Sequence, residues 1–400
     1  MRIFFSNNFF LLIIFTADIF AFIIYQFSIS SAIFYKNFTL FLLIIISFIK
    51  IRFIFKNILI IFFFLLIFIC LVHNLLFLNT SNFQLLFQSL FLIIYPMLIF
   101  NYAANISQNL FSYISFLKKF VYINTIFMII EIFFTDFIIS LDVKGFFNLV
   151  KSVYTGLNPI SGFPANWHIN FPDVYPRRGA GLLMAPLASG MISAFVSLII
   201  LHEYTQKRII SLISLLLPCF GLILSQSRGP ILFFIIGSII ILNSIKNKSL
   251  FLKENYFIIL LLFSLTIFYI FPFLENRFTF DSSAKGHLQS LIFNFSNMFN
   301  IPILGYGIGT EGAIIARENI ETVGGGEGAI FSLMFQTGLI ITFIFVIWLF
   351  TLCFRVENTD YKGLNKIILI SSIPIIFTSE HLYTITGFIF IWVFIGINRH

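Results

Sequence analysis

The chain has 400 residues, of which 59% are hydrophobic and only 10% are charged, and its mean hydropathy is +1.02. A soluble globular domain has about 25% charged residues, so this composition argues against a soluble protein and predicts a polytopic membrane protein. The formal net charge of +8 does not indicate nucleic-acid binding, because the Lys and Arg residues fall in short segments between apolar runs.

Apolar runs long enough to span a bilayer recur from one end of the chain to the other. A backbone in lipid must satisfy its own hydrogen bonds, so each run is expected to be a helix. At about 20 residues per span, the sequence predicts about twelve transmembrane helices. Their expected centres are Ile14, Leu43, Leu66, Phe91, Met128, Ile192, Leu216, Ile236, Leu262, Ile341, Ile373 and Phe390. The first run lacks a small-residue cleavage site and is therefore expected to be a retained span.

The basic residues support this count and give it an orientation. With twelve spans and both termini in the cytoplasm, the short segments that carry most of the basic residues fall on one side, as the positive-inside rule requires. They hold Arg2, Lys50, Arg52, Lys56, Lys118, Lys119, Lys207, Arg208, Lys246, Lys248, Lys253, Arg355, Lys362, Lys366 and Arg399, which are 15 of the 24 Lys and Arg residues. We therefore expect an all-α membrane protein, with residues 1–400 as a single transmembrane domain and two long extracytoplasmic loops, 141–178 and 275–328.

The first long loop, 141–178, interleaves prolines and glycines with the aromatic residues Tyr154, Phe163, Trp167 and Tyr175. This spacing prevents a long regular helix. Aromatic faces on such a scaffold suit stacking on sugars, and they equally suit a loop that lies on the membrane interface. Both interpretations stay open.

Two adjacent arginines, Arg177 and Arg178, stand where this loop meets an apolar run. Glycines at 179 and 181 are expected to leave the backbone open to close approach by a ligand. The planar guanidinium presents a fork of donors that matches phosphate, so the pair predicts a grip on a phosphate-bearing lipid at the membrane surface. The alternative is that both arginines anchor a helix end among the lipid headgroups.

Arg228 lies in a very short connection, 225–230, between two apolar runs. An Arg near a helix end reaches the interface at small cost, so it can be a simple anchor. The polar residues Ser225, Gln226 and Ser227 and the turn-forming pair 229–230 favour a functional site instead.

The second long loop contains a glycine-rich turn, 302–312, and a candidate base, Glu327. The glycines of the turn resemble a phosphate-cradling loop, but the turn lacks the Lys-Ser/Thr of a Walker sequence, so a flexible re-entrant turn is the favoured interpretation. Glu327 follows Gly324–Gly326 at the start of the tenth span and is either a general base or a solvated acid.

The remaining polar residues of the apolar runs predict less. Glu380 and His381 in a tight outer turn are expected to share a structural hydrogen bond. Asp18 and Glu131, single acids on separate spans, are expected to serve packing or folding. No cluster of Cys, His, Asp and Glu suits a metal ion, and no cofactor is expected.

Taken in order, the motifs resemble the O-antigen polymerase and O-antigen ligase superfamily of bacterial membrane proteins that assemble glycans. The first family pattern is an Arg followed by Gly, Pro and Gly at three, eight and twelve residues. The chain matches it with Arg178, Gly181, Pro186 and Gly190.

Three further patterns of the superfamily lie later in the chain. A Ser-Arg-Gly at a helix end is matched by 227–229, and a Pro-x-x-Gly-x-Gly-x-Gly turn is matched by 302–309. Ligase-like members carry a His eleven residues before a Gly, and at that spacing before Gly338 this chain has Glu327. This difference favours a repeat-unit polymerase over a ligase.

The resemblance implies glycosyl transfer between lipid-linked sugars at the outer leaflet of the bacterial inner membrane. The donor would be a glycan on undecaprenyl diphosphate and the acceptor a second lipid-linked repeat unit, with no metal or other cofactor. The implied site residues are Arg178, Arg228 and Arg177 for the diphosphate, Glu327 as the catalytic base, and Gly305, Gly307 and Gly309 as a substrate-binding loop. The lipid bilayer, a chain-length regulator and a flippase would be its partners, and nucleic acid would not.

Three rival functions remain at this point. A ligase would differ only in using the lipid A-core as acceptor. A flippase or polysaccharide exporter would show polar residues through the membrane depth of several helices, and the sequence does not show them. A structural subunit of an assembly complex would need Arg178 and Arg228 only for folding.

Overall fold

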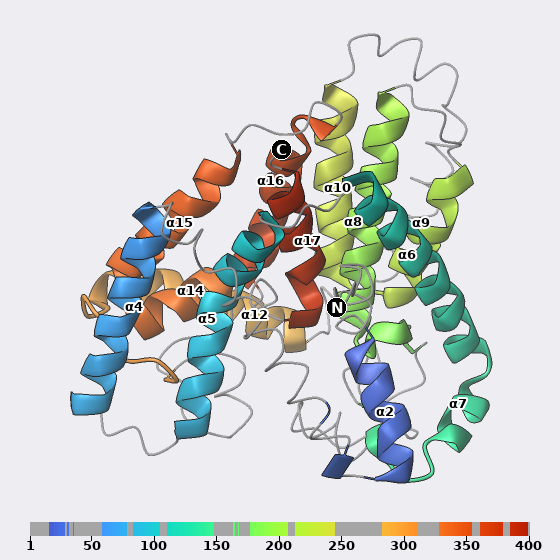
Figure 1. The fold of residues 1–400 in the computed structure, drawn as a ribbon, viewed down its shortest axis with the longest axis horizontal. Helices are drawn as coiled ribbons and strands as arrows, with labels where there is room; N and C mark the ends of the chain where they lie inside the picture. Colours follow the sequence, from blue (N-terminus) through green and yellow to red (C-terminus); the bar gives the residue numbers. More distant parts are fainter. Residues whose placement is uncertain are drawn as a thin grey trace, which may run out of the picture. The chain divides into compact units, whose positions relative to one another are not determined.

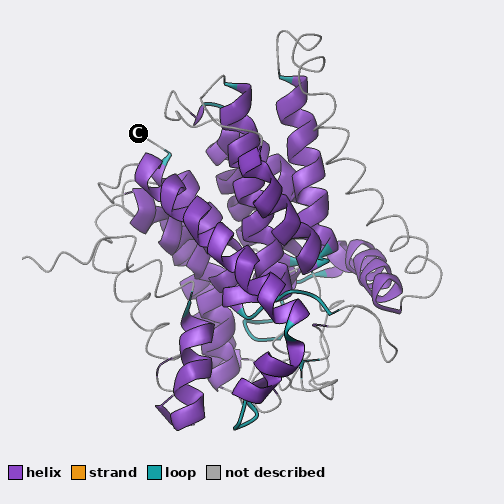
Figure 2. Ribbon diagram, turned by 90° about the vertical axis from the view of Figure 1, so that its right-hand side faces the viewer, coloured by secondary structure: helices purple, strands orange, loops and turns teal. Residues whose placement is uncertain are grey.

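The computed structural model describes residues 16–28, 30–31, 35, 58–77, 83–104, 110–147, 163–164, 167, 177–206, 213–244, 282–310, 328–353, 361–378 and 385–398. Within these ranges the chain forms thirteen α-helices and two short 3-10 helices, without a β-strand element (Figure 1). Figure 2 shows the same residues as helices joined by loops. The expected all-α class is confirmed for this part of the chain.

Nine of the twelve expected span centres lie inside described helices, and the other three, Ile14, Leu43 and Leu262, fall outside the described residues. By length and composition, α8 (Pro186–Thr205) can cross a membrane alone, and the pair α6–α7 is a second candidate if it counts as one bent span. The other apolar helical stretches in the described ranges have 10–17 residues. These apolar helices are compatible with a membrane protein, and the number of twelve spans stays a prediction.

The chain gathers into two compact units. Unit 1 comprises Met1–Ile45 and Ser107–Thr279, and unit 2 comprises Ile46–Ile106 and Phe280–His400. Each unit therefore combines two stretches that are separated along the chain.

Unit 1 is built around α8, which is buried along nearly its whole length. Its neighbours are α6 (Leu110–Phe133), α9 (Ile213–Ser225) and α10 (Arg228–Asn243). Small residues allow these helices to approach closely, as is usual where helices pack in lipid. A Cβ at Gly190 on α8 would clash with the Ser225 hydroxyl, and one at Gly221 on α9 would clash with the Thr125 hydroxyl.

The other elements of unit 1 are α2 (Ala17–Phe27), α7 (Thr135–Leu141) and the 3-10 helix η5 (Gly181–Leu183). The chain bends by 98° between α6 and α7. After α7, the carboxylate of Asp142 accepts the backbone N–H groups of Phe146 and Phe147 and a side-chain N–H of Gln26 on α2. This carboxylate joins the end of α2 to the start of the first long loop.

Unit 2 contains α4 (Ile58–Phe77), α5 (Phe83–Ala104), α12 (Ser282–Asn297), η6 (Met298–Asn300), α14 (Ala329–Thr337), α15 (Leu339–Cys353), α16 (Leu364–Thr378) and α17 (Ile385–Ile397). Its core includes Trp348 of α15 stacked on Trp392 of α17, with ring centroids 5.6 Å apart. The sequence predicted one continuous tenth span here. The chain instead breaks at Gly338, whose φ of 87° ends α14 and starts α15.

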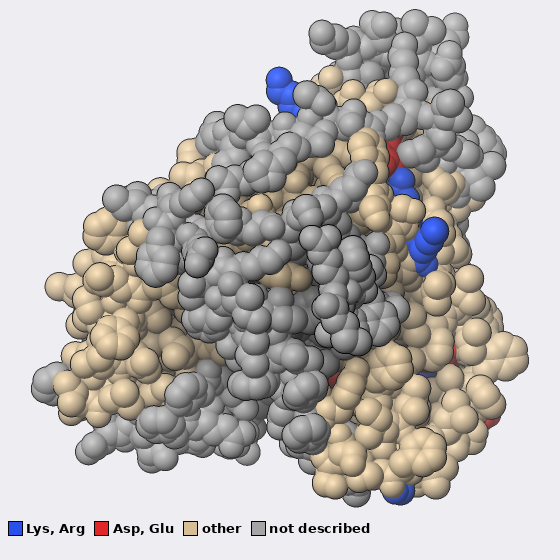
Figure 3. Space-filling view, in the orientation of Figure 1, with Lys and Arg blue, Asp and Glu red and all other residues tan. Residues whose placement is uncertain are grey.

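Large apolar side chains remain exposed on both units. In unit 1, Phe27, Phe133, Phe134, Phe137 and Val143 are each more than half exposed. Charged side chains are sparse on the described part of the face that Figure 3 shows. Large apolar side chains exposed in such number are typical of a surface that contacts lipid or another protein.

Candidate functional site

The two ends of unit 1 are defined by contacts between its helices. At one end, Lys118 of α6 donates from Nζ to Glu203 Oε2 of α8 at 2.5 Å, and the Tyr122 hydroxyl donates to the backbone oxygen of Ser214 at the start of α9. Glu131 lies further along α6, about 20 Å from Lys118 at 1.5 Å per residue. The segment before α8 contacts α6 at Glu131, and the same segment is bonded to Leu224 near the end of α9.

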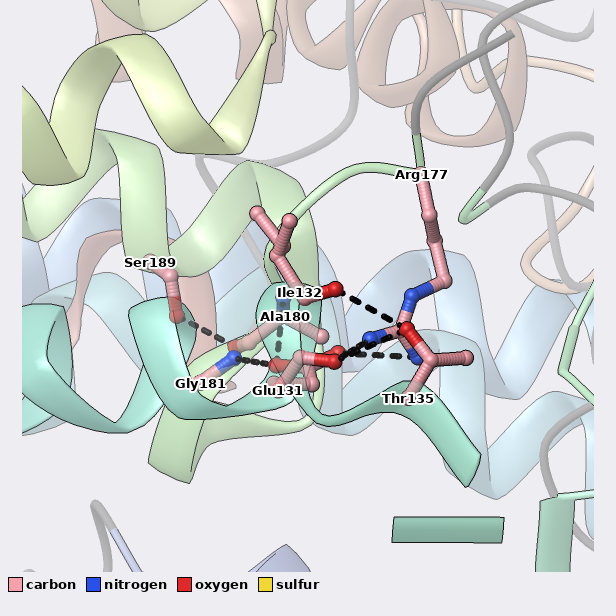
Figure 4. Close-up of polar contacts among 7 residues, drawn as sticks. All are labelled: Glu131, Ile132, Thr135, Arg177, Ala180, Gly181 and Ser189. Carbon is pink, nitrogen blue, oxygen red and sulfur yellow. Dashed lines mark hydrogen bonds and ion pairs between the residues drawn. The ribbon is translucent and has the colours of Figure 1, made fainter. Parts of the chain in front are cut away.

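The carboxylate of Glu131 holds the backbone that precedes α8. Its Oε2 accepts the N–H groups of Ala180 at 3.1 Å and Gly181 at 2.8 Å (Figure 4). About two turns back on the same helix, Asn124 Oδ1 accepts the N–H of Leu182 at 2.8 Å. Two residues of one α6 face therefore bind three consecutive N–H groups.

This close approach explains the glycines at 179 and 181. A Cβ at Gly179 would come within 2.9 Å of Met128, and one at Gly181 would clash with Asn124. Gly181 also has a φ of +60°, which side chains disfavour. The expectation that these glycines open the backbone to a ligand is corrected: the neighbour that they admit is α6.

Arg177 points inward, onto Glu131. Only 8% of the residue is exposed, Nη1 lies 3.6 Å from Glu131 Oε1, and Nη2 donates to the backbone oxygen of Glu131. The guanidinium carbon lies 3.7 Å from the centroid of the Phe163 ring, a cation–π contact. Burial lowers the pKa of Arg177, and the carboxylate opposes that shift. In place of the expected diphosphate contact, we assign Arg177 a structural role.

The aromatic residues of the first loop are also turned inward. Phe163 and Trp167 are 0% and 2% exposed, and their rings stack with centroids 5.6 Å apart. Both rings contact Phe147, which stacks on Phe22 of α2. For these two residues the structure supports neither sugar stacking nor a position on the membrane interface, because packing has already desolvated their faces. Tyr154 and Tyr175 lie outside the described residues.

Arg178 differs from its neighbour in being partly exposed. Its backbone N–H donates to the oxygen of Trp167 at 2.6 Å, and the next N–H, of Gly179, donates to Leu224 at the end of α9 at 2.8 Å. The segment that carries Arg178 is thereby joined directly to the helix that leads to Arg228.

Arg228 is exposed at the start of α10, after a two-residue turn. In that turn Gln226 has a φ of 48°, and Ser227 occupies the N-cap position. The same region packs on α8, because a Cβ at Gly190 would meet Ser225 and Pro230. The structure thus brings two motifs, 178–190 and 225–230, together at one end of unit 1.

The glycine-rich turn belongs to unit 2, where its donors are already used. Gly305, Gly307 and Gly309 all have positive φ, of 73°, 113° and 90°. Their N–H groups donate, in that order, to the backbone oxygen of Pro302, the backbone oxygen of Gln336 and the Gln336 side chain. The turn is held against the end of α14, so these N–H groups bind internal acceptors and not the substrate that the resemblance implies for this loop.

Other candidates from the sequence cannot be placed in the same way. Glu327, Gly324–Gly326, Glu380 and His381 lie outside the described residues. Within the described residues there is no group of three or more His, Cys, Asp and Glu side chains that could hold a metal ion.

The residue whose partner the sequence did not identify is Glu131. It was expected to serve packing or folding, but its partner was not named, because Arg177 lies 46 positions away in the sequence. One signal in the sequence could have suggested the pair. Glu131 is an acid inside an expected apolar span, and Arg177 and Arg178 are two bases at the start of the next expected span. Charged groups inside apolar surroundings usually pair with one another.

Comparisons of this chain with protein-family models, with curated proteins and with solved structures found no match.

Proposed function

We propose that the chain is a polymerase of surface-polysaccharide repeat units of the O-antigen type, acting on undecaprenyl-diphosphate-linked glycans at the outer leaflet of a bacterial inner membrane. The observation that carries the proposal is the meeting of the Arg178 and Arg228 segments at one end of an apolar helical unit. Lys118, a residue expected in the cytoplasm, lies at the opposite end of α6. This arrangement agrees with two arginines on the outer side.

The membrane location is supported by the surface of the described helices. Exposed Phe133, Phe134 and Phe137 lie at the bend between α6 and α7 and just after it, and α8 has the length and composition of a span. Transfer of an apolar side chain of this size from water to an apolar environment is favourable by about 1.5–3 kcal/mol when the side chain is fully transferred. A bilayer therefore accounts for their exposure.

The proposed reaction is a substitution at the anomeric carbon of the donor sugar. The acceptor hydroxyl oxygen forms a bond to that carbon while the bond from the carbon to the diphosphate oxygen breaks. Negative charge develops on the departing diphosphate, and Arg178 and Arg228 stabilise it. Glu327, nominated by the sequence, takes the proton of the acceptor hydroxyl.

The roles of the other candidates change in this proposal. Arg177 is assigned to Glu131, because its guanidinium is buried against that carboxylate. Gly305, Gly307 and Gly309 are assigned to the packing of the second loop, because their N–H groups donate to internal acceptors. The diphosphate site thus reduces to Arg178 and Arg228.

The test is the surface-glycan ladder of cells that lack the native protein and carry wild type, Arg178→Ala, Arg228→Ala or Glu327→Ala at matched membrane abundance. A polymerase predicts a full ladder with wild type and a core bearing a single repeat with each variant. Lys362→Ala, which removes an exposed cation elsewhere in the chain, serves as the control and should leave the ladder unchanged.

Two other outcomes would replace the proposal. Loss of all glycan from the core while long polymer stays on the carrier lipid would indicate a ligase, the nearest rival. Normal ladders from all the variants would remove Arg178, Arg228 and Glu327 from the site and favour a transport or structural function.

A further inference from the structure

We infer that Glu131 is a positioning residue for Arg178: its carboxylate, reaching from α6, fixes the backbone segment that presents Arg178 beside the α9–α10 turn. The inference rests on the proposed function, because it takes Arg178 as a ligand of the diphosphate. It adds a residue that neither the motifs nor the proposed reaction includes.

The backbone after Arg178 is held at every step. Five consecutive N–H groups, those of residues 178 to 182, donate to acceptors on other parts of unit 1. In order, the acceptors are the backbone oxygen of Trp167, the backbone oxygen of Leu224, Glu131 Oε2 twice and Asn124 Oδ1. These bonds place the Cα of Arg178 before any ligand arrives. Groups that are held in advance lose less entropy when they bind, which raises affinity.

The two adjacent arginines have different roles: Arg177 pairs with Glu131, and Arg178 is the proposed ligand of the diphosphate. A bare carboxylate near the diphosphate would repel it, because like charges interact strongly where water is scarce. Arg177 neutralises Glu131 from the buried side, with Nη1 at 3.6 Å from Oε1. The carboxylate can then hold Ala180 and Gly181 without opposing the anion that Arg178 is proposed to bind.

The experiment separates the acceptor function of Glu131 from its charge. Both Ala180 and Gly181 donate to Oε2, and an amide oxygen can accept the same two bonds. The pair Glu131→Gln with Arg177→Met removes both charges and keeps the acceptor. The pair Glu131→Leu with Arg177→Met removes both charges and the acceptor. Each pair avoids an uncompensated buried charge, which is the main threat to folding.

The experiment measures equilibrium binding of two lipid probes to the purified full-length protein in detergent, with native mass spectrometry as the readout. The two probes are undecaprenyl diphosphate and undecaprenol, which has the same tail without phosphate. The ratio of their affinities reports recognition of the diphosphate by the folded fraction. A residue that served only stability would change the folded fraction and leave this ratio unchanged.

We expect the Gln pair to keep the wild-type ratio. We expect the Leu pair and Arg178→Ala each to lower the ratio about 10- to 100-fold, because each loses one charge-assisted contact with the diphosphate. Adding Arg178→Ala to the Leu pair should cause no further loss, because both changes act through the same contact. Glu203→Gln, which breaks the ion pair at the other end of α6 and α8, should keep the wild-type ratio.

The outcomes distinguish the inference from the function beneath it. If Arg178→Ala keeps the wild-type ratio, the proposed diphosphate site fails and the inference fails with it. If Arg178→Ala lowers the ratio and the Leu pair does not, the inference alone is overturned. Should the Leu pair not fold, Asn124→Leu removes the neighbouring acceptor and should lower the ratio in the same direction. A wild-type ratio in that folded variant would also overturn the inference.

Discussion

The guanidinium of Arg177 lies on the carboxylate of Glu131, with 3.6 Å between Nη1 and Oε1, although 46 positions separate the two residues in the sequence. This pair fixes the end of the first long loop on α6. It also assigns different roles to two arginines that look equivalent in the sequence, because Arg177 is buried and Arg178 is partly exposed.

The first prediction concerns the ion pair itself. Arg177→Met should lower the free energy of unfolding by about 3–5 kcal/mol, because it leaves a buried carboxylate without its counter-charge. Adding Glu131→Gln should recover much of that loss, since no buried charge then remains. Chemical denaturation in detergent measures both variants. Equal losses in the single and the double variant would show that the pair contributes through packing alone.

The second prediction concerns the close approach of α6 at Gly181. Gly181→Ala should cost about 1–2 kcal/mol for the positive φ and about 1–3 kcal/mol more for the clash with Asn124. Gly145→Ala is the matched control, because Gly145 also has a positive φ, of +72°, but its Cβ would meet nothing within 4 Å. In detergent, the free energy of unfolding of Gly181→Ala should therefore be well below that of Gly145→Ala. Similar values would contradict the contact with Asn124.

The third prediction applies the same comparison to unit 2. A Cβ at Gly338 would clash with the backbone oxygen of Ile303, so Gly338→Ala should displace the glycine-rich turn as well as strain the helix break. Gly363→Ala, at a φ of +82° with open space around the Cβ, is the control. Limited proteolysis should cut the turn faster in Gly338→Ala than in Gly363→Ala. Equal cleavage rates would mean that the turn does not depend on Gly338.

The fourth prediction uses tryptophan fluorescence. The chain has three tryptophans, and Trp167, Trp348 and Trp392 are at most 2% exposed. Their emission should be blue-shifted and only weakly quenched by iodide, and unfolding should shift it to the red. With Trp348→Phe and Trp392→Phe, the remaining emission of Trp167 should not respond to added glycan. A response would restore sugar stacking as a function of Trp167.

Much of the helical layout was predictable, because helix formation in an apolar chain depends on local composition. Nine expected span centres lie in described helices, including Met128 in α6 and Ile192 in α8. The break at Gly338 and the bend of 98° between α6 and α7 were not predicted. Hydropathy reports where a chain is apolar, and it does not report where the helix axis changes direction.

The sequence by itself determined the all-α class and the segments that carry the candidate arginines, because apolar runs, basic residues and glycines are local features. Only the tertiary structure decided what those residues contact. In that structure Arg177 pairs with Glu131, and Phe163 and Trp167 are buried. The N–H groups of Gly305, Gly307 and Gly309 donate to internal acceptors. These contacts join residues far apart along the chain, and their energies arise from the burial that packing creates.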